Sequence, residues 1–226
     1  MNEVDESVTR DAALIGRLAR LRTAVVSDCL DRAGVRNQAM ASRIRPLFPG
    51  ARLAGYAMTV HVIADEEIPA DRGQWYRGEL QAVDALNEGD VMVVSTCPDG
   101  PFWGELLATA SRYRGARGIV MDAGTRDTLQ LIEMRFPTFA ASVSPLDSLG
   151  RLNVDVVMQP IECGGVAVNP HDLVLGDNDG VVVIPAALAD EVITLAEEKS
   201  SGEDLVRTKL AEGMGAWEAF RTYGVI

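Results

Sequence analysis

The sequence predicts an α/β protein built around a parallel β-sheet, with helices at both ends of the chain. Apolar runs at residues 90–96 and 118–123 flank an amphipathic segment at 103–113. Strands that alternate with helices of this length are typical of βαβ units. Residues 154–185 are dense in Val, Gly, Asp and Pro and show no helical periodicity, which predicts several strands joined by tight turns.

The N-terminal part of the chain combines helices with short strands. Apolar residues at helical spacing predict a first helix over 11–21. A second helix is expected to begin at Ser27 or Asp28, which are favourable N-cap residues, and to end at Gly34. Short β-type runs bounded by Pro and Gly follow over 44–64.

The remaining elements complete a single-domain organisation. Residues 74–86 are predicted to be helical, and Pro185 opens a charged amphipathic tail that we expect to pack on the domain or on a neighbouring subunit. We divide the one domain into N-terminal helices (1–36), an α/β core (37–185) and a helical tail (186–226).

Composition and charge exclude several classes of protein. The 226 residues carry a formal net charge of −12, which repels phosphate backbones and anionic lipid, so we expect no nucleic-acid or membrane partner. Cys29, Cys97 and Cys163 are far apart and form no CxxC motif, so neither a disulfide framework nor a zinc site is predicted. The acidic N-terminus is unlike a secretory signal and no apolar run is long enough to span a bilayer. We therefore predict a cytoplasmic protein.

Polar residues gather where the predicted βαβ unit would bind a ligand. In a right-handed crossover, the carboxyl ends of both strands and the amino end of the helix lie at the same edge of the sheet. This geometry brings Gly104, Glu105 and Leu106 close to Arg126 and Asp127.

These residue types suit a small anion and a cation. The first N–H groups of a helix have no internal partner and lie at the positive end of its dipole. Gly104 permits close approach to the backbone, Arg126 provides a planar fork for a carboxylate, and Asp127 is an acceptor that can hold a divalent cation. The alternative is a solvated Arg-Asp pair in which Asp127 caps the following helix and Glu105 interacts with its own helix dipole. The coincidence of sheet edge, glycine and converging charges favours the binding site.

The spacing of these residues also resembles a known family. Glu105, twenty intervening residues and Arg126-Asp127 are similar to the acidic-x20-Arg-Asp signature of the metal-dependent pyruvate aldolases typified by 4-hydroxy-4-methyl-2-oxoglutarate aldolase. The same superfamily contains the regulators of ribonuclease E activity A. The resemblance extends from about Thr23 to Gly213, with family-like segments in family order: SDCLDRAG, GARLAGYAMTV, WGELLATA, MDAGTRD and ECGGVAVNPHDLVLGDNDGVVVIP.

The resemblance implies a fold and an assembly. It implies a β/β/α swivelling domain like the phosphohistidine domains, preceded by N-terminal helices and followed by a C-terminal helical tail. It also implies homo-oligomers, trimers or hexamers, with sites between subunits.

The resemblance implies roles for the site residues as well. Arg126 would hold the pyruvate carboxylate together with the backbone amides of Gly104, Glu105, Leu106 and Leu107. Asp127 would ligate Mg²⁺ or Mn²⁺ directly, and Glu105 would act through water on the metal.

Two positions depart from the family pattern. An acidic residue from the tail of an adjacent subunit would complete the metal site, and Glu203 is the best match, although the surrounding KSSGED differs from the usual pattern. His171 stands where the family usually has Gly, which we interpret as a turn substitution away from the metal.

The composition favours a metal as the electron sink for an enolate. The chain has only two lysines, Lys199 and Lys209, both in the polar tail, which disfavours a Schiff base. With only His61 and His171, an all-histidine metal site is excluded, and oxygen ligands suit Mg²⁺ or Mn²⁺.

The predicted function is that of a class II pyruvate aldolase, a carbon-carbon lyase. It would cleave a 4-hydroxy-2-oxo acid such as 4-hydroxy-4-methyl-2-oxoglutarate to pyruvate, with oxaloacetate decarboxylation as a side activity because both reactions use the same enolate. The alternatives are a non-catalytic regulator of a ribonuclease E-type partner and another enolate-forming lyase of the same superfamily.

Other polar motifs receive structural interpretations. DNDG at 177–180 lacks the closing glutamate of a calcium loop and predicts a hairpin turn. Trp75 and Trp103 flank the proposed site in sequence, and ordinary packing is the favoured interpretation for both. His61 is expected to be a half-buried residue with a hydrogen-bond partner.

Overall fold

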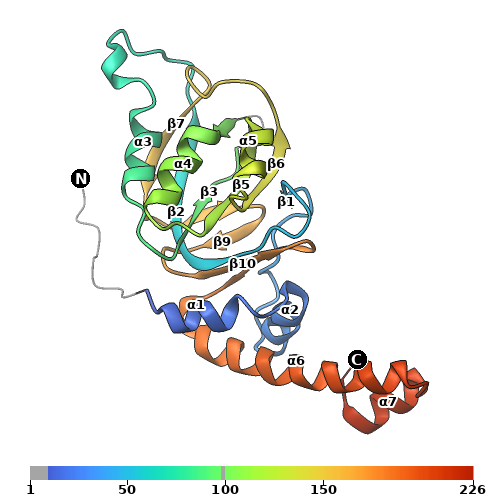
Figure 1. The fold of residues 1–226 in the computed structure, drawn as a ribbon. Helices are drawn as coiled ribbons and strands as arrows, with labels where there is room; N and C mark the ends of the chain where they lie inside the picture. Colours follow the sequence, from blue (N-terminus) through green and yellow to red (C-terminus); the bar gives the residue numbers. More distant parts are fainter. Residues whose placement is uncertain (1–9, 98–99, 226) are drawn as a thin grey trace.

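One mixed β-sheet organises the chain, whose computed structural model describes residues 10–97 and 100–225 (Figure 1). Along the main path, the strands pair in the order β1 (Arg45–Pro46), β6 (Thr138–Val143), β5 (Gly118–Thr125), β3 (Asp90–Val94), β2 (Leu53–Ala64), β10 (Leu173–Asp177) and β11 (Gly180–Ile184). Two further strands join this sheet from the side: β4 (Pro101–Trp103) pairs with β5, and β7 (Leu152–Val157) pairs with β2. A separate antiparallel pair consists of β8 (Ile161–Cys163) and β9 (Val166–Val168).

The centre of the sheet is parallel, as the βαβ pattern predicted. Strands β2, β3, β5 and β6 pair in parallel, with α4 (Glu105–Tyr113) between β3 and β5 and α5 (Thr128–Glu133) between β5 and β6. The β-rich stretch is confirmed too, since β7 to β11 occupy it and β10 and β11 form an antiparallel hairpin. The DNDG motif is therefore the predicted hairpin turn.

The sheet curls until its two edges nearly meet. β1 and β11, at opposite ends of the strand path, are in contact, and the Arg45 guanidinium donates to the Asp179 carbonyl at 2.9 Å. Side chains alternate between the two faces of each strand, so Val91 and Val93 face the interior while Met92 and Val94 face outward under helices. This nearly closed, barrel-like α/β sheet confirms the predicted fold class.

Helices cover the outside of the sheet in two groups (Figure 1). The first group, which packs on β2, β3 and β5, contains α3 (Arg77–Asp84), α4 and α5. The second group packs on β2, β10 and β11 and contains α1 (Ala12–Leu18), α2 (Thr23–Arg32) and α6 (Ala189–Ala211). The short α7 (Ala216–Tyr223) follows α6. Single 3₁₀ turns precede α3 and α6, at Arg72–Gln74 and Ala186–Leu188.

The predicted start of the second helix is wrong. It begins at Thr23 rather than at Ser27 or Asp28. The cap comes from a distant part of the chain, because the Asp177 carboxylate in the β10–β11 hairpin accepts from the Thr23 backbone N–H at 2.9 Å and from its hydroxyl at 2.7 Å. A cap supplied through space leaves no local signal at the helix start.

The predicted helix over 103–113 also starts later, at Glu105. Trp103 belongs to β4, which pairs in parallel with β5, and the Trp103 carbonyl accepts from the Arg126 N–H at 2.9 Å. The extra strand pairs with the last residues of β5, Gly124 and Thr125. It thereby seats the first turn of α4 beside the residues that follow β5.

The remote cap gives a stability prediction. Asp177→Ala is expected to lower the free energy of unfolding by about 1–3 kcal/mol, because both buried Thr23 donors lose their acceptor. Urea denaturation followed by circular dichroism measures this change. Asp179→Ala in the same turn is the control, with an expected change within about 0.5 kcal/mol. Equal stabilities of the two variants would contradict the capping role.

Candidate active site

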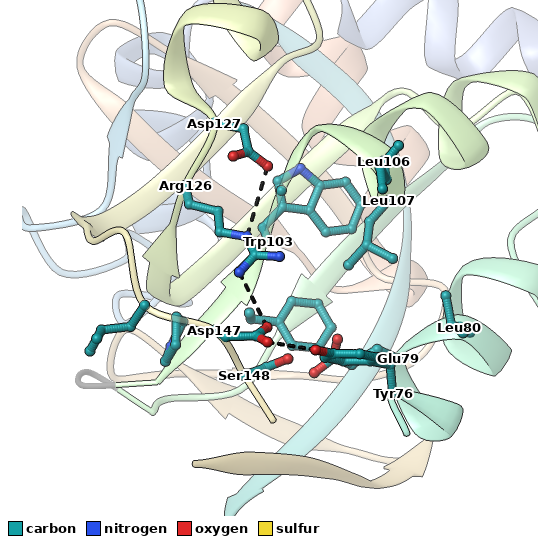
Figure 2. Close-up of a pocket in the computed structure, with 14 residues that line it drawn as sticks. Tyr76, Glu79, Leu80, Trp103, Leu106, Leu107, Arg126, Asp127, Asp147 and Ser148 are labelled. Atoms are coloured by element: carbon teal, nitrogen blue, oxygen red, sulfur yellow. Dashed lines mark hydrogen bonds and ion pairs between the residues drawn. The ribbon is translucent and has the colours of Figure 1, made fainter. Parts of the chain in front are cut away.

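A cavity of about 220 Å³ opens at the carboxyl ends of β4 and β5, beside the first turn of α4 (Figure 2). One wall consists of Gly104, Arg126 and Asp127. The opposite wall comes from the start of α3 and from the loop after β6, through four polar residues: Tyr76, Glu79, Asp147 and Ser148. The apolar lining completes the cavity: Leu80, Pro101, Phe102, Trp103, Leu106, Leu107 and Leu146.

The backbone at the end of β5 aims the Asp127 side chain at α4. Asp127 has a φ of 55°, in the left-handed region that Asp tolerates better than most residues. Its Oδ2 accepts from the Glu105 backbone N–H at 3.1 Å. Asp127 occupies the N-cap position of α5 without a side-chain bond to that helix. The alternative in which Asp127 caps the helix that follows it is therefore wrong, because the carboxylate caps α4 instead.

Gly104 matters for the space that it leaves and not for its backbone conformation. Its φ of −151° is accessible to any residue. A Cβ at this position would lie 2.7 Å from Asp127 Oδ2, well inside van der Waals contact. Glycine therefore allows the carboxylate to approach the amino end of α4.

Arg126 lies between two carboxylates. Its Nη1 is 3.2 Å from Asp147 Oδ1, and its Nε is 3.8 Å from Asp127 Oδ2 (Figure 2). The other oxygen of Asp147 accepts from the Tyr76 hydroxyl at 2.5 Å, and this hydrogen bond raises the pKa of Tyr76. Arg126 is thus positioned by Asp147, which in turn is held by Tyr76.

Glu79 is a buried acid in the same wall. Only 5% of its surface is exposed, and burial raises the pKa of Glu79 to about 7. Asp147 nearby adds to the rise, while a hydrogen bond with Ser148 and the charge of Arg126 oppose it. Glu79 therefore changes its charge near neutral pH.

The structure brings together most of the residues predicted for the site. Gly104, Leu106, Leu107, Arg126 and Asp127 all line the cavity. The Glu105 backbone contacts Asp127, while its carboxylate accepts from Thr109 within α4 and lies outside the lining.

Within one chain, Glu203 does not line the cavity. It lies on α6, on the other side of the sheet from α4 (Figure 1), and its carboxylate pairs with Arg22 at 2.7 Å and Lys199 at 3.5 Å. Its contribution to a neighbouring subunit stays a prediction.

Sequence reasoning missed the wall formed by Tyr76, Glu79, Asp147 and Ser148. These residues belong to segments without a recognisable motif. Trp103 was expected to be ordinary packing; it is 2% exposed, yet it lines the cavity. Trp75 does not line it, and its indole donates to the Pro69 carbonyl.

Both histidines lie in the local structures predicted for them. His61 is partly exposed and its Nδ1 lies 3.0 Å from Asp155. His171 has a φ of 70° in the turn before β10, a left-handed conformation that glycine adopts readily. Neither histidine lines the cavity.

The oxygen donors present fit a hard cation that keeps most of its waters. Within residues 10–97 and 100–225, no three His, Cys, Asp or Glu side chains form a cluster able to hold a metal. Mg²⁺ needs no such cluster and commonly binds through one or two carboxylates plus water. Asp127 meets this need, since its side chain is 43% exposed at the cavity.

Both lysines are unsuited to Schiff-base chemistry. Lys199 pairs with Asp28 and Glu203, and the hydrogen bond to Asp28 raises the pKa of Lys199. Lys209 is paired with Glu212, which raises the pKa of Lys209. A nucleophilic lysine needs a lowered pKa, and neither residue lines the cavity.

No helix in the described parts of the chain has both the length and the apolar character needed to cross a bilayer.

Known proteins resemble this chain over most of its length. The family model described as "RraA-like: Aldolase/RraA" matches residues 23–183. A Halalkalibacterium halodurans protein named "Putative 4-hydroxy-4-methyl-2-oxoglutarate aldolase" is 28% identical over 212 residues, covering 91% of this chain and 92% of that protein.

Solved structures share the fold over nearly the whole chain. An uncharacterized protein from Pseudomonas syringae pv. tomato is 25% identical with a TM-score of 0.81, covering 94% of this chain and 98% of that one. Streptomyces coelicolor RraAS2, described as an unusual member of the RNase ES inhibitor RraA protein family, is 25% identical with a TM-score of 0.79. This second likeness covers 89% of this chain and 100% of RraAS2.

The packing at Gly104 is testable by a matched pair of glycine substitutions. Gly104→Ala is expected to lower stability by about 0.5–1.5 kcal/mol, because the new methyl group moves the Asp127 carboxylate away from the Glu105 N–H. Gly16→Ala, in the open middle of α1, is expected to raise stability by about 0.5–1 kcal/mol. Thermal unfolding compares both with the wild type. Stabilisation by both alanines would show that Gly104 is not sterically constrained.

The buried acid predicts a pH dependence of stability. Burial raises the pKa of Glu79 from 4.5 to about 7 on folding. The desolvation penalty is therefore absent below about pH 4.5, where the carboxyl is neutral in both states, and stability is lost as the pH rises from there through about 7. The loss is on the order of 2–3 kcal/mol. In Glu79→Gln, this part of the pH dependence is expected to disappear when urea unfolding is measured from pH 4.5 to 8. Parallel curves for the variant and the wild type would contradict the assignment.

Proposed function

Because the chain belongs to the RraA-like (aldolase/RraA) family, we propose that it is a divalent-metal-dependent class II pyruvate aldolase. It would cleave a 4-hydroxy-2-oxo acid to pyruvate and a second carbonyl compound. The observation that carries the proposal is the convergence of Arg126, Asp127 and the amino end of α4 on one cavity. The name of the Halalkalibacterium halodurans relative makes 4-hydroxy-4-methyl-2-oxoglutarate the first substrate to test.

Arg126 and the amino end of α4 would bind the 2-oxo acid. The first N–H groups of a helix have no partner within it, and the dipole adds partial positive charge there. The Glu105 amide already donates to Asp127. The amides of Gly104, Leu106 and Leu107 and the Arg126 guanidinium would therefore provide the donors for the substrate carboxylate. Asp147 already holds Arg126 at the cavity wall, so part of the cost of ordering this long side chain is met before the substrate binds.

Asp127 would hold Mg²⁺ or Mn²⁺, with Glu105 acting through water. The bound cation would supply Lewis-acid polarisation of the keto group, the role that neither paired lysine can fill. The half-exposed Asp127 carboxylate beside the cavity supports this assignment.

The reaction needs a proton transfer and an electron sink. A base removes the proton of the C4 hydroxyl, the C3–C4 bond breaks, and its electron pair forms the pyruvate enolate. Arg126 stabilises the negative charge that develops, and protonation at C3 then gives pyruvate. Loss of CO₂ from oxaloacetate forms the same enolate, so decarboxylation is the expected companion activity.

We also propose a homo-oligomer, trimeric or hexameric. α6 and α7 extend away from the sheet (Figure 1) and expose large apolar side chains, among them Leu205, Trp217 and Phe220. Apolar surface of this kind favours contact with another subunit. Such packing is the route by which Glu203 would reach a neighbouring site.

A second candidate is regulation of a ribonuclease E-type partner. The likeness to Streptomyces coelicolor RraAS2, from a family described as inhibitors of RNase ES, favours it. Another enolate-forming lyase of the same superfamily is the remaining alternative, because a shared fold does not determine the substrate.

Metal-dependent release of pyruvate tests the proposal. We expect turnover of oxaloacetate or 4-hydroxy-4-methyl-2-oxoglutarate with Mg²⁺ or Mn²⁺, and its loss with excess chelator. Asp127→Ala is expected to abolish turnover and Arg126→Ala to reduce kcat/KM by about 100-fold or more. Asp179→Ala, an exposed carboxylate in the β10–β11 turn, is the control and retains activity. Full activity of Asp127→Ala would remove the mechanism, and no turnover with any metal would favour the regulator.

A further inference from the structure

The charges that line the cavity are unbalanced. Of the described residues that line it, Arg126 is the only cation, whereas Glu79, Asp127 and Asp147 are acids. If Asp127 binds the metal, Glu79 and Asp147 remain as acids on the opposite wall. In the proposed binding mode, the metal on Asp127 and the Arg126 guanidinium both bind the pyruvyl end of the substrate, so the opposite wall has no cation for a second carboxylate.

Arg126 carries a single positive charge, which is already engaged on both sides. Its Nη1 already lies 3.2 Å from Asp147, and the same guanidinium is the proposed anchor of the pyruvyl carboxylate. A second carboxylate on the substrate would meet Asp147 and, above about pH 7, ionised Glu79. Like charges in a partly enclosed cavity repel more strongly than in water, because the effective dielectric constant is lower.

The rest of the lining suits an alkyl group. The cavity is lined by Leu80 on α3, Leu106 on α4 and Leu146 in the loop after β6, together with Phe102 and Trp103. Figure 2 shows Leu80, Leu106 and Trp103 among the lining side chains. The leucines are partly exposed, at 48%, 79% and 44%. A bound aliphatic chain would remove this apolar surface from water, a favourable term that a carboxylate does not supply.

We propose that the fragment released with pyruvate is an uncharged, aliphatic carbonyl compound, so that the preferred substrate is a monocarboxylic 4-hydroxy-2-oxo acid with an alkyl group on C4. This inference rests on the proposed aldolase function and narrows it. The compound in the relative's name carries two carboxylates, and the cavity seen here disfavours the second.

The chemistry balances without any additional reactant. The C4 hydroxyl loses its proton to a base, the C3–C4 bond breaks, and C4 leaves as an aldehyde or ketone. The electron pair of the broken bond stays on C3 as the enolate, which regains a proton and becomes pyruvate. The leaving fragment keeps its alkyl group throughout.

Two measurements separate this inference from the proposed function. Exchange of the pyruvate methyl protons in D₂O, followed by NMR with Mg²⁺, tests enolate formation without any leaving fragment. Cleavage of 4-hydroxy-2-oxohexanoate to pyruvate and propanal is then compared with cleavage of 4-hydroxy-4-methyl-2-oxoglutarate. The expected kcat/KM ratio favours the monocarboxylate by about tenfold or more.

Two substitutions of Leu80, one charged and one neutral, test whether charge in the cavity wall sets the substrate preference. Leu80→Arg places a cation in the cavity wall, and Leu80→Gln is a polar, uncharged match. Leu80→Arg is expected to shift the substrate ratio toward the dicarboxylate by about tenfold relative to Leu80→Gln.

Each outcome decides one of the two claims. Absence of metal-dependent exchange on pyruvate overturns the proposed function. If pyruvate protons exchange but the wild type prefers the dicarboxylate, the inference is overturned and the aldolase proposal stands. The same holds if the two Leu80 variants have equal kcat/KM ratios for the two substrates.

Discussion

The hydrogen bond between the Asp127 carboxylate and the first backbone amide of α4 is the constraint on which the site depends. It joins the end of β5 to the start of the neighbouring helix and requires two unusual local features. Asp127 adopts a left-handed backbone conformation, and Gly104 leaves the space that a Cβ would fill. Because both features serve the same contact, they position the acidic side chain and the helix amino end as one unit.

The barrel-like sheet provides the rigid frame for that unit. β5 is paired with β3, β4 and β6, so its carboxyl end is fixed from both sides. The loop after β6 then crosses toward α3 and supplies Asp147, which contacts Arg126 and Tyr76. The Arg126 guanidinium is thereby held directly by the Asp147 carboxylate. The Tyr76 hydroxyl holds it indirectly, by donating to Asp147.

Burial gives the opposite wall its chemical character. Glu79 lies on a helix face turned toward the protein, and desolvation moves the pKa of Glu79 to about 7. Together with Asp147 it makes this wall anionic, while the surrounding leucines make it apolar. One anchored cation, an anionic wall and apolar side chains thus line the same cavity, an arrangement that the motif residues alone do not convey.

The sequence by itself determined the βαβ core, the hairpin at 177–180 and the proximity of Gly104, Arg126 and Asp127, because strand and helix periodicity and the shared edge of parallel strands are local or topological rules. Only the tertiary structure decided the cap of α2 and the wall opposite Arg126. Thr23 and Asp177 are 154 positions apart, and Tyr76 and Asp147 are 71 apart. Contacts of this kind arise when the barrel closes and its loops fold back, so no pattern within either segment encodes the partner. The raised pKa of Glu79 was also decided by the tertiary structure, because it comes from desolvation of the carboxyl in the folded protein.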